Sequence, residues 1–236
     1  MARRLACASV GGAHNSARPS VSRHKFGILT GRPVARRTVE NAVRKLGFNR
    51  VAGADEVGRG CLAGPVVAAS VVLNPYRRFP GLRDSKLLSA KQREHLFTEI
   101  TESSEWAVAE VSPEDIDRLN VHRASLDAIR RALMTLVPRP DFALIDGFSV
   151  PELVVPHRRI VAGDRKCAVI AAASVVAKVT RDRLMAELHQ RDPRYGFDRH
   201  KGYATRMHLD ALARFGYSPA HRRSFRPRSL FTSSSG

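Results

Sequence analysis

The sequence has few cysteines, and their spacing argues against two familiar kinds of site. Cys7, Cys61 and Cys167 lie far apart in a chain of 236 residues, and no C-x-x-C pair occurs. A structural zinc site and a disulfide framework both need cysteines at close or regular spacing. We therefore expect neither of them, and we expect the protein to work in a reducing compartment.

Long apolar runs are also missing. The longest, at residues 66–73 and 168–177, fall well short of the roughly 20 residues that a membrane-spanning helix needs. Residues 1–34 are rich in Arg, Ser, Gly and Pro, contain no acid and lack the apolar core of a secretory signal. We interpret them as a basic, disordered tail or as the result of a start codon placed too early, although they also resemble an organelle transit peptide.

Acidic residues are scarce relative to basic ones. The chain has 40 Lys and Arg against 22 Asp and Glu, a formal net charge of +18, and a pI near 11.1. Residues 1–50 hold 11 of the basic residues and a single acid, Glu40, and the rest of the chain is basic as well. Such a balance indicates a polyanionic partner, above all nucleic acid, and says little about the fold.

The hydropathy pattern predicts one α/β domain at residues 35–228, between the basic tail at 1–34 and a flexible tail at 229–236. The expected strands are residues 50–55, 65–73, 106–111, 142–146 and 160–162. The expected helices are residues 34–46, 89–100, 121–136, 167–190 and 205–215, with one more that starts after Ser112. This order of elements predicts a mixed sheet flanked by helices.

Four acids stand at the ends of separate predicted elements. Asp55 and Glu56 end the first strand, Asp146 ends the fourth, and Asp164 precedes the longest helix. Each acid alone is a common turn or cap residue, but together they are the hard oxygen ligands that Mg²⁺ and Mn²⁺ prefer. Successive side chains of a strand point to opposite faces, so we expect the chain to leave strand geometry at Asp55 and Glu56. The set predicts a site for two metal ions that hydrolyses a phosphodiester.

A glycine-rich turn follows the first pair of acids. Gly58-Arg59-Gly60 would let the main chain approach a ribose closely, and the ribose 2′-hydroxyl is the group that distinguishes RNA from DNA. A tight turn with no binding role explains the same tripeptide equally well.

Further candidate contacts to nucleic acid lie in loops and on the longest helix. They are Ser85 and Lys86 in a loop, Ser174, Lys178 and Arg181 on one helix face, and Tyr203, which can stack on a sugar or base. Each has an ordinary structural alternative, such as a solvated loop, close helix packing or a buried tyrosine. We expect His208, His221, Arg222 and Arg223 to be exposed loop residues.

Six segments, taken together, resemble type 2 ribonuclease H in its bacterial form, the ribonuclease HII family. They are VAGADEVGRGCLAGPVVAA from Val51, DSKLLS from Asp84, ALIDG from Ala143, AGDRKCAVIAAASVVAKVTRDRLM from Ala162, YGFDRHKGYATRMH from Tyr195 and HRRSF from His221. They follow the order and spacing of the family and extend over residues 46–228. Two positions depart from the family pattern, because Cys61 stands where proline is commoner and Phe148 where asparagine is common. We expect neither residue to touch the acids.

The resemblance implies a ribonuclease H-like fold with a mixed five-stranded sheet. It implies an endonuclease that cuts the RNA of RNA–DNA hybrids, and that cuts 5′ to single ribonucleotides in duplex DNA to leave 3′-hydroxyl and 5′-phosphate ends. The implied roles are ribonucleotide removal, DNA replication and repair. It also implies the four acids as ligands of Mn²⁺ or Mg²⁺, Gly58-Arg59-Gly60 as the reader of the 2′-hydroxyl, and Tyr203 as a sensor of the RNA–DNA junction. We expect a cytoplasmic monomer with no membrane contact and no obligatory protein partner.

Two other interpretations remain open. Another ribonuclease H-like nuclease, such as an exonuclease or an integrase-like enzyme, would share the acids and metals but does not explain Gly58-Arg59-Gly60 together with Tyr203. A basic nucleic-acid-binding protein without activity explains the charge of +18 but not the four acids at the ends of core elements. Replacing Asp55 by Asn separates an enzyme, which loses cleavage, from a binder, which keeps its affinity.

Overall fold

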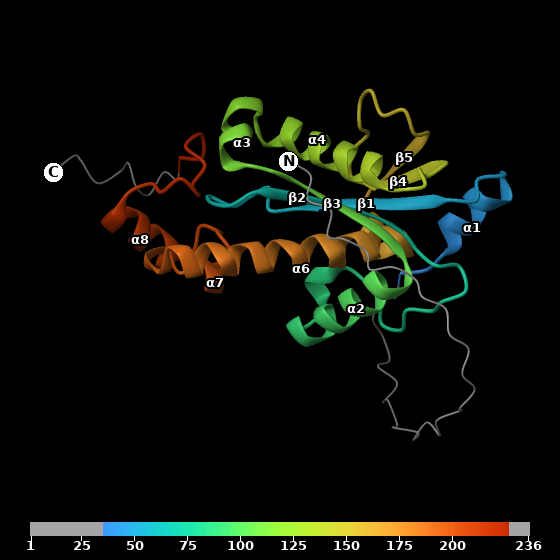
Figure 1. The fold of residues 1–236 in the computed structure, drawn as a ribbon, viewed down its shortest axis with the longest axis horizontal. Coiled ribbons are helices and arrows are strands. Elements are labelled where there is room, and N and C mark those ends of the chain that lie inside the picture. The colour runs from blue at the N-terminus through green and yellow to red at the C-terminus, as the bar shows by residue number, and fades with distance from the viewer. Residues whose placement is uncertain (1–34, 227–236) are drawn as a thin grey trace, which may run out of the picture.

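Five strands form one mixed sheet at the centre of the molecule, in the order β3-β2-β1-β4-β5 (Figure 1). The computed structural model describes residues 35–226, so the expected tails at 1–34 and 229–236 lie outside the described residues. The strands are β1 Val51–Val57, β2 Val66–Val72, β3 Glu105–Val111, β4 Phe142–Asp146 and β5 His157–Ile160. The predicted mixed five-stranded sheet is confirmed.

Eight α-helices and two short 3₁₀ turns complete the described part of the chain. They are α1 Thr38–Lys45, α2 Ala90–Ser103, α3 Pro113–Leu119, α4 Val121–Thr135, α5 Gly163–Lys166, α6 Ala168–Arg191, α7 Phe197–His200 and α8 Arg206–Phe215, with the turns Ser85–Leu87 and Pro193–Tyr195. Among these described helices, none combines the length and the apolar character that crossing a membrane requires.

The strand pairings explain why the central strands are so apolar. β1 pairs antiparallel with β2 and parallel with β4, and β4 pairs parallel with β5. Every residue of β2 is buried, as expected for a strand covered on both faces. The helices lie on both sides of the sheet: α3 and α4 cover one face, and α2 and α6 cover the other (Figure 1).

Local signals in the sequence set several helix starts. The Ser89 side chain accepts a hydrogen bond from the Gln92 amide, and the Gln92 side chain accepts one from the Ser89 amide, which is a capping box. Ser112 caps α3, with proline at the first helical position. Thr205 caps α8 in the same way. Each pattern satisfies amide groups that a helix leaves without partners at its first turn.

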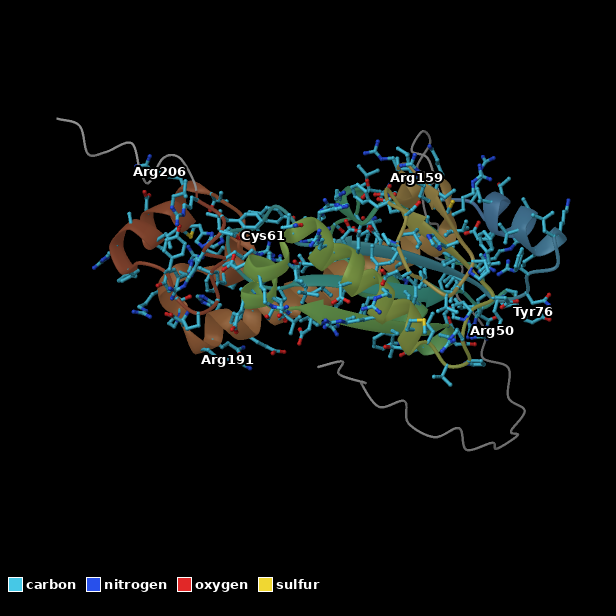
Figure 2. All side chains as sticks on the ribbon, turned by 90° about the horizontal axis from the view of Figure 1, so that it is seen from above. Arg50, Cys61, Tyr76, Arg159, Arg191 and Arg206 are labelled. Carbon is cyan, nitrogen blue, oxygen red and sulfur yellow. The ribbon has the colours of Figure 1, made fainter. Side chains whose placement is uncertain are left out.

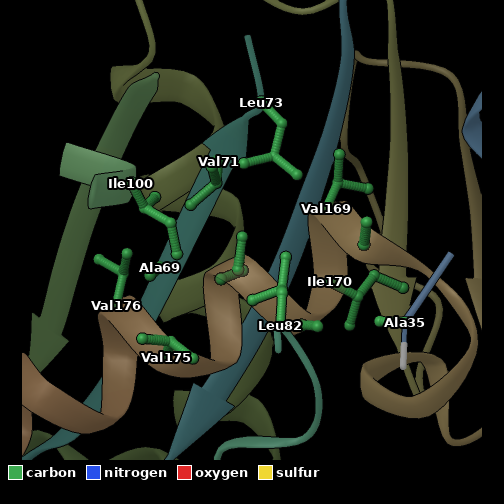
Figure 3. Close-up of a cluster of buried hydrophobic side chains, with 14 of the residues drawn as sticks. Ala35, Ala69, Val71, Leu73, Leu82, Ile100, Val169, Ile170, Val175 and Val176 are labelled. Atoms are coloured by element: carbon green, nitrogen blue, oxygen red, sulfur yellow. The ribbon is translucent and has the colours of Figure 1, made fainter. Parts of the chain in front are cut away.

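Helix α6 packs directly on the sheet, with Val169, Ile170, Val175 and Val176 among the buried side chains (Figure 3). A side chain at Gly53 of β1 would place its Cβ only 2.1 Å from the Val169 carbonyl carbon, so only glycine allows this approach. Ala171, Ala172 and Ala173 of α6 are fully buried in the same layer. The small residues of the helix therefore have the packing role that is their usual meaning.

We predict that Gly53→Ala destabilises the protein strongly. The added methyl group meets the backbone of α6, which cannot move without shifting the whole helix, so we expect a loss of about 3 kcal/mol in the free energy of unfolding. Denaturant unfolding measures this loss. Gly60→Ala is the matched control, because no atom lies within 4 Å of its added Cβ. A Gly53→Ala variant as stable as the Gly60→Ala variant would contradict the proposed close contact.

Candidate active site at the diverging ends of β1 and β4

The parallel strands β1 and β4 separate just where two of the predicted acids begin. Their last paired residues are Ala54 and Ile145, and the next residue of each strand is Asp55 and Asp146. Beyond this point the Glu56 amide is satisfied by the Asp55 carboxylate, at 2.8 Å. The two aspartates therefore lie at the carboxyl ends of two neighbouring parallel strands, which is a usual place for sites in α/β sheets.

Asp164 joins these two acids from the start of the α5–α6 segment. The Gly163 amide donates to Asp146 Oδ1 at 2.7 Å, which fixes the segment against the end of β4. Asp164 itself is 6% exposed and lies close enough to Asp55 and Asp146 to raise the pKa of Asp55 and to have its own pKa raised by Asp146. The structure therefore brings Asp55, Asp146 and Asp164 together.

Glu56 lies on the opposite face of the sheet, and the expected break in the strand is wrong. β1 continues through Asp55 and Glu56 to Val57, because both residues still pair with β2. Val51 packs with α6 and Ala54 with α4, so the alternation puts Asp55 on the α6 face and Glu56 on the α4 face.

Glu56 is held on that face by the arginine of the glycine-rich turn. Arg59 Nη1 lies 3.1 Å from Glu56 Oε1, and the Arg59 guanidinium stacks 4.6 Å from the centre of the Phe148 ring. The ring of Phe148 also meets His122 of α4 edge-on. The Phe148 amide also donates to the Asp146 carbonyl at 2.7 Å, so the expectation that Phe148 touches none of the acids is wrong for the main chain, while its ring supports Arg59, the partner of Glu56.

Burial and repulsion from neighbouring acids make Asp55, Glu56 and Asp164 hard to ionise. Desolvation raises the pKa of Asp55 well above its ordinary value, and the charges of Glu56, Asp146 and Asp164 raise it further. Desolvation also raises the pKa of Glu56, which the Arg59 hydrogen bond partly opposes. Desolvation also raises the pKa of Asp164, and the charge of the nearby Asp84 makes the next largest contribution to that rise. A cation placed among these groups would relieve both effects.

Asp84 is a further acid of this region that we did not select from the sequence. It is 1% exposed, and its carboxylate accepts from the Lys86 amide at 2.9 Å and from Arg165 Nε at 3.4 Å. Its influence on Asp164 shows that it lies near the site. The only signal in the sequence was its position before Ser85 and Lys86, where we interpreted it as part of a polar loop.

The donor chemistry of the acids fits a divalent cation. Carboxylate oxygens from Asp55, Asp146 and Asp164 share one face, and these are the ligands that Mg²⁺ and Mn²⁺ prefer. In this conformation Asp146 is turned to the Gly163 amide and Glu56 to Arg59. Within residues 35–226, no three acid, histidine or cysteine side chains are close enough together to enclose a metal ion. Binding would therefore require these side chains to turn inward.

The predicted contacts on α6 divide into two kinds. Ser174 and Ser85 are both buried and share a hydrogen bond of 2.7 Å, so they tie the Asp84 loop to α6. Lys178 forms an ion pair of 2.6 Å with Asp182. Arg181 is fully buried, and its guanidinium is bound to main-chain carbonyls, so the expected direct contact with a phosphate is wrong. Lys86 is exposed, and its charge opposes part of the rise that desolvation causes in the pKa of Asp164.

Tyr203 lies in the segment between α7 and α8, with 43% of its surface exposed, so its ring is accessible. Burial of its hydroxyl raises its pKa, and the Cys61 thiol beside it acts in the same direction. This segment is tied to the turn after Gly60, because the Leu62 amide donates to the Gly202 carbonyl at 2.8 Å. Figure 2 shows Cys61 where the sheet meets the C-terminal helices.

Three residues that we expected to be exposed are buried instead. His208, His221 and Arg222 are at most 2% exposed, and only Arg223 lies on the surface. The rings of the two histidines share a hydrogen bond, with 3.0 Å between their Nε2 atoms. Burial lowers the pKa of His221 to about 4, and the charge of His208 is the second cause of this shift. The expectation was wrong because aromatic rings from Tyr195 and Phe197 cover this polar stretch.

Comparison with known proteins points to one family. A family model for ribonuclease HII matches residues 52–228. Ribonuclease HII of Cereibacter sphaeroides is 54% identical over 191 residues, which cover 80% of this chain and 90% of that protein. The crystal structure of ribonuclease H2 from Pyrococcus horikoshii superposes with a TM-score of 0.65 at 26% identity, covering 77% of this chain and 97% of that one.

Two further solved structures share the fold. The ribonuclease HII of Archaeoglobus fulgidus, solved with PCNA, has a TM-score of 0.66 at 28% identity and covers 76% of this chain and 96% of that one. A Bst ribonuclease HIII solved with Mn²⁺ has a TM-score of 0.58 at 20% identity, covering 80% of this chain and 71% of that one. The second likeness concerns the fold alone.

We predict that Asp55→Asn stabilises the metal-free protein at alkaline pH. The folded state binds the Asp55 proton more tightly than the unfolded chain, so stability is greatest below the ordinary pKa of about 4 and falls as the pH rises toward the raised value. The variant carries no such charge. In chelator, its free energy of unfolding should exceed that of the unaltered protein at pH 8, and the difference should shrink toward pH 4.

The control for this comparison is Asp127→Asn on α4, which removes a carboxylate paired with exposed arginines. Its effect should stay within about 1 kcal/mol. An Asp55→Asn variant that is less stable than the unaltered protein at pH 8 would show that the buried charge is compensated within the protein.

Proposed function

Since the chain belongs to the ribonuclease HII family, it is a ribonuclease H, and we propose that it cuts duplex DNA on the 5′ side of a single embedded ribonucleotide as well as the RNA strand of RNA–DNA hybrids. The observation that carries the proposal is the meeting of Asp55, Asp146 and Asp164 where β1 and β4 separate, beside the turn Gly58-Arg59-Gly60. Acids of this kind next to a loop that can read a ribose account for both the cut and its position.

We propose that the acids hold Mg²⁺ or Mn²⁺, two ions when substrate is bound. Asp55, Asp146 and Asp164 would hold them from the α6 face, and Glu56 would complete the set by leaving Arg59. When bound, such ions lower the pKa of a water molecule and neutralise charge at phosphorus. The acids themselves would orient the ions. As carboxylates, they would repel the phosphate groups of the substrate until cations are present.

The neighbouring residues would place the substrate. The main chain of Gly58-Arg59-Gly60 is proposed to contact the 2′-hydroxyl of the ribonucleotide whose 5′ phosphodiester is cut. Tyr203 would stack on the adjoining sugar, and Lys86 would contact a phosphate. Ser85, Ser174 and Lys178 are proposed to support these contacts by holding the Asp84 loop and the exposed side of α6 in place. The strongly basic surface would supply attraction that does not depend on sequence.

The direct experiment uses a labelled DNA duplex with one ribonucleotide, incubated with the protein in Mg²⁺, in Mn²⁺ or in chelator. We expect a metal-dependent cut directly 5′ to the ribonucleotide and none in an all-DNA duplex. Asp55→Asn should reduce the rate by at least about 100-fold, a loss typical for removal of a central electrostatic group. Asp127→Asn, on α4 across the sheet from Asp55, should cut at the unaltered rate.

Two results would redirect the assignment. Cutting of long hybrids alone would leave a ribonuclease H that does not recognise single ribonucleotides. Cutting that needs a strand end, tested with a closed circular duplex containing one ribonucleotide, would contradict an endonuclease.

A further inference from the structure

Two arginines are buried completely beside the turn Gly58-Arg59-Gly60. Arg181 of α6 and Arg222 near the end of the described chain each have 0% exposed surface. Within residues 35–226 neither guanidinium forms an ion pair with an acid, and each donates its hydrogen bonds to main-chain carbonyls instead. Two buried like charges are costly, and they are tolerated only because carbonyl dipoles solvate both groups. Desolvation lowers the pKa of Arg222 to about 10, and Arg181 contributes to the same shift.

Nearly all of these carbonyls belong to one short segment. Arg222 binds the carbonyls of Arg59 and Gly64, at distances from 2.8 to 3.0 Å. Arg181 binds the carbonyls of Ala63 at 3.1 Å and Pro65 at 2.9 Å. Four carbonyls of residues 59–65 are therefore turned inward, onto two planar forks that present several donors at fixed angles.

The amides of the same segment divide into unpaired and paired ones. Among the described residues, the amides of Arg59 and Gly60 find no acceptor, whereas the amides of Leu62 and Gly64 donate to Gly202 and Ala220 at 2.8 Å. The residues with paired amides, Leu62 and Gly64, thus follow shortly after Arg59 and Gly60, whose amides could contact substrate. Unpaired donors at a fixed place are what a main-chain reader of a hydroxyl group requires.

Arg181 also reaches the second element that we expect at the substrate. Its Nη1 donates to the Lys201 carbonyl at 2.9 Å, two residues before Tyr203. Gly58 is adapted to this arginine, because a Cβ at that position would lie 2.2 Å from Arg181 Nε. One guanidinium therefore fixes the distance between the glycine-rich turn and the Tyr203 segment.

We propose that Arg181 and Arg222 are positioning residues for ribonucleotide recognition, which hold the carbonyls of residues 59–65 inward so that the Arg59 and Gly60 amides face the ribose 2′-hydroxyl. This inference rests on the proposed function of the turn. Lysine at either position keeps the charge but loses the planar fork, so it cannot hold two or three carbonyls at once. The substitution should therefore impair discrimination between ribose and deoxyribose more than it impairs binding of nucleic acid.

The test measures binding without cutting, in an Asp146→Asn background with Mg²⁺ present. Fluorescence anisotropy compares a duplex containing one ribonucleotide with the same duplex in all-DNA form. We expect the parent to prefer the ribonucleotide duplex by at least about tenfold, as for a site built around a substrate hydroxyl. Adding Arg222→Lys or Arg181→Lys should reduce this ratio to less than about twofold, with the all-DNA affinity retained. Arg130→Lys, an exposed arginine of α4, is the matched control and should keep the parental ratio.

The possible outcomes distinguish the role of the turn Gly58-Arg59-Gly60 from the role of the two arginines. No preference in the parent would mean that the proposed function of the turn has failed, and the inference with it. A preference that survives both lysine variants, shown to be folded by their thermal transitions, would overturn the role of the arginines alone. An equal loss of affinity for both duplexes would also overturn it, because that result indicates general structural damage.

A second measurement needs neither lysine variant. Hydrogen exchange in the Asp146→Asn protein should be fast at the Arg59 and Gly60 amides and slow at those of Leu62 and Gly64. The ribonucleotide duplex should slow exchange at the first two amides, and the all-DNA duplex should not. Equal exchange at all four amides, or equal protection by the two duplexes, would overturn the inference.

Discussion

The close contact between helix α6 and strand β1 is the constraint on which the rest of the structure depends. Gly53 lets the backbone of the helix lie against the strand, and the alanines of α6 fill the same layer. This contact brings the short helix α5, which carries Asp164 just before α6, to the end of β1, with Asp55. Helix α6 carries Arg181 about three turns beyond Val169, beside the glycine-rich turn. The spacing between Asp164 and the anchoring arginine is thus set by α6 and the short helix directly before it.

The site is divided electrostatically along that helix. At its start, buried acids repel one another, and their raised pKa values favour the arrival of cations. Further along, two buried guanidinium groups are solvated by main-chain carbonyls of residues 59–65 and form no ion pair with a carboxylate of residues 35–226. Between the two lies Arg59, whose main chain belongs to the anchored turn and whose side chain pairs with Glu56. Release of that pair would be needed for Glu56 to join the other acids, so Arg59 links the two regions.

Much of the fold and most of the acidic site could be predicted from the sequence, for physical reasons. Runs such as Val66–Val72 are apolar and β-branched over a strand's length, and Ser89 and Ser112 mark helix starts through their caps. Asp55 and Asp146 end such runs, so their meeting follows from parallel pairing of the two strands. The sequence could not show that β1 continues through Glu56, because that depends on its pairing with β2.

The buried polar residues were the least predictable. His208, His221 and Arg222 occur in a polar stretch without hydrophobic periodicity, so the sequence offered no sign that they are buried. Besides the aromatic rings that cover them, the Arg222 amide donates to the Leu62 carbonyl and His221 pairs with Ala63, across about 160 residues of sequence. Arg181 likewise lies on the helix face that periodicity assigns to a charged group, yet the glycines of the neighbouring turn open a place for it. Long-range contacts of this kind have no local signature.

A metal site at the diverging ends of β1 and β4 can be tested by Mn²⁺ binding, followed by electron paramagnetic resonance on the unaltered protein and on Asp55→Asn, Asp146→Asn and Asp127→Asn variants. We expect saturable binding by the unaltered protein and by Asp127→Asn. Asp55→Asn and Asp146→Asn should each bind at least about tenfold more weakly, since each removes a charged ligand from a small set. Equal binding by all four proteins would place the metal elsewhere and contradict the assignment of the site to the diverging ends of β1 and β4.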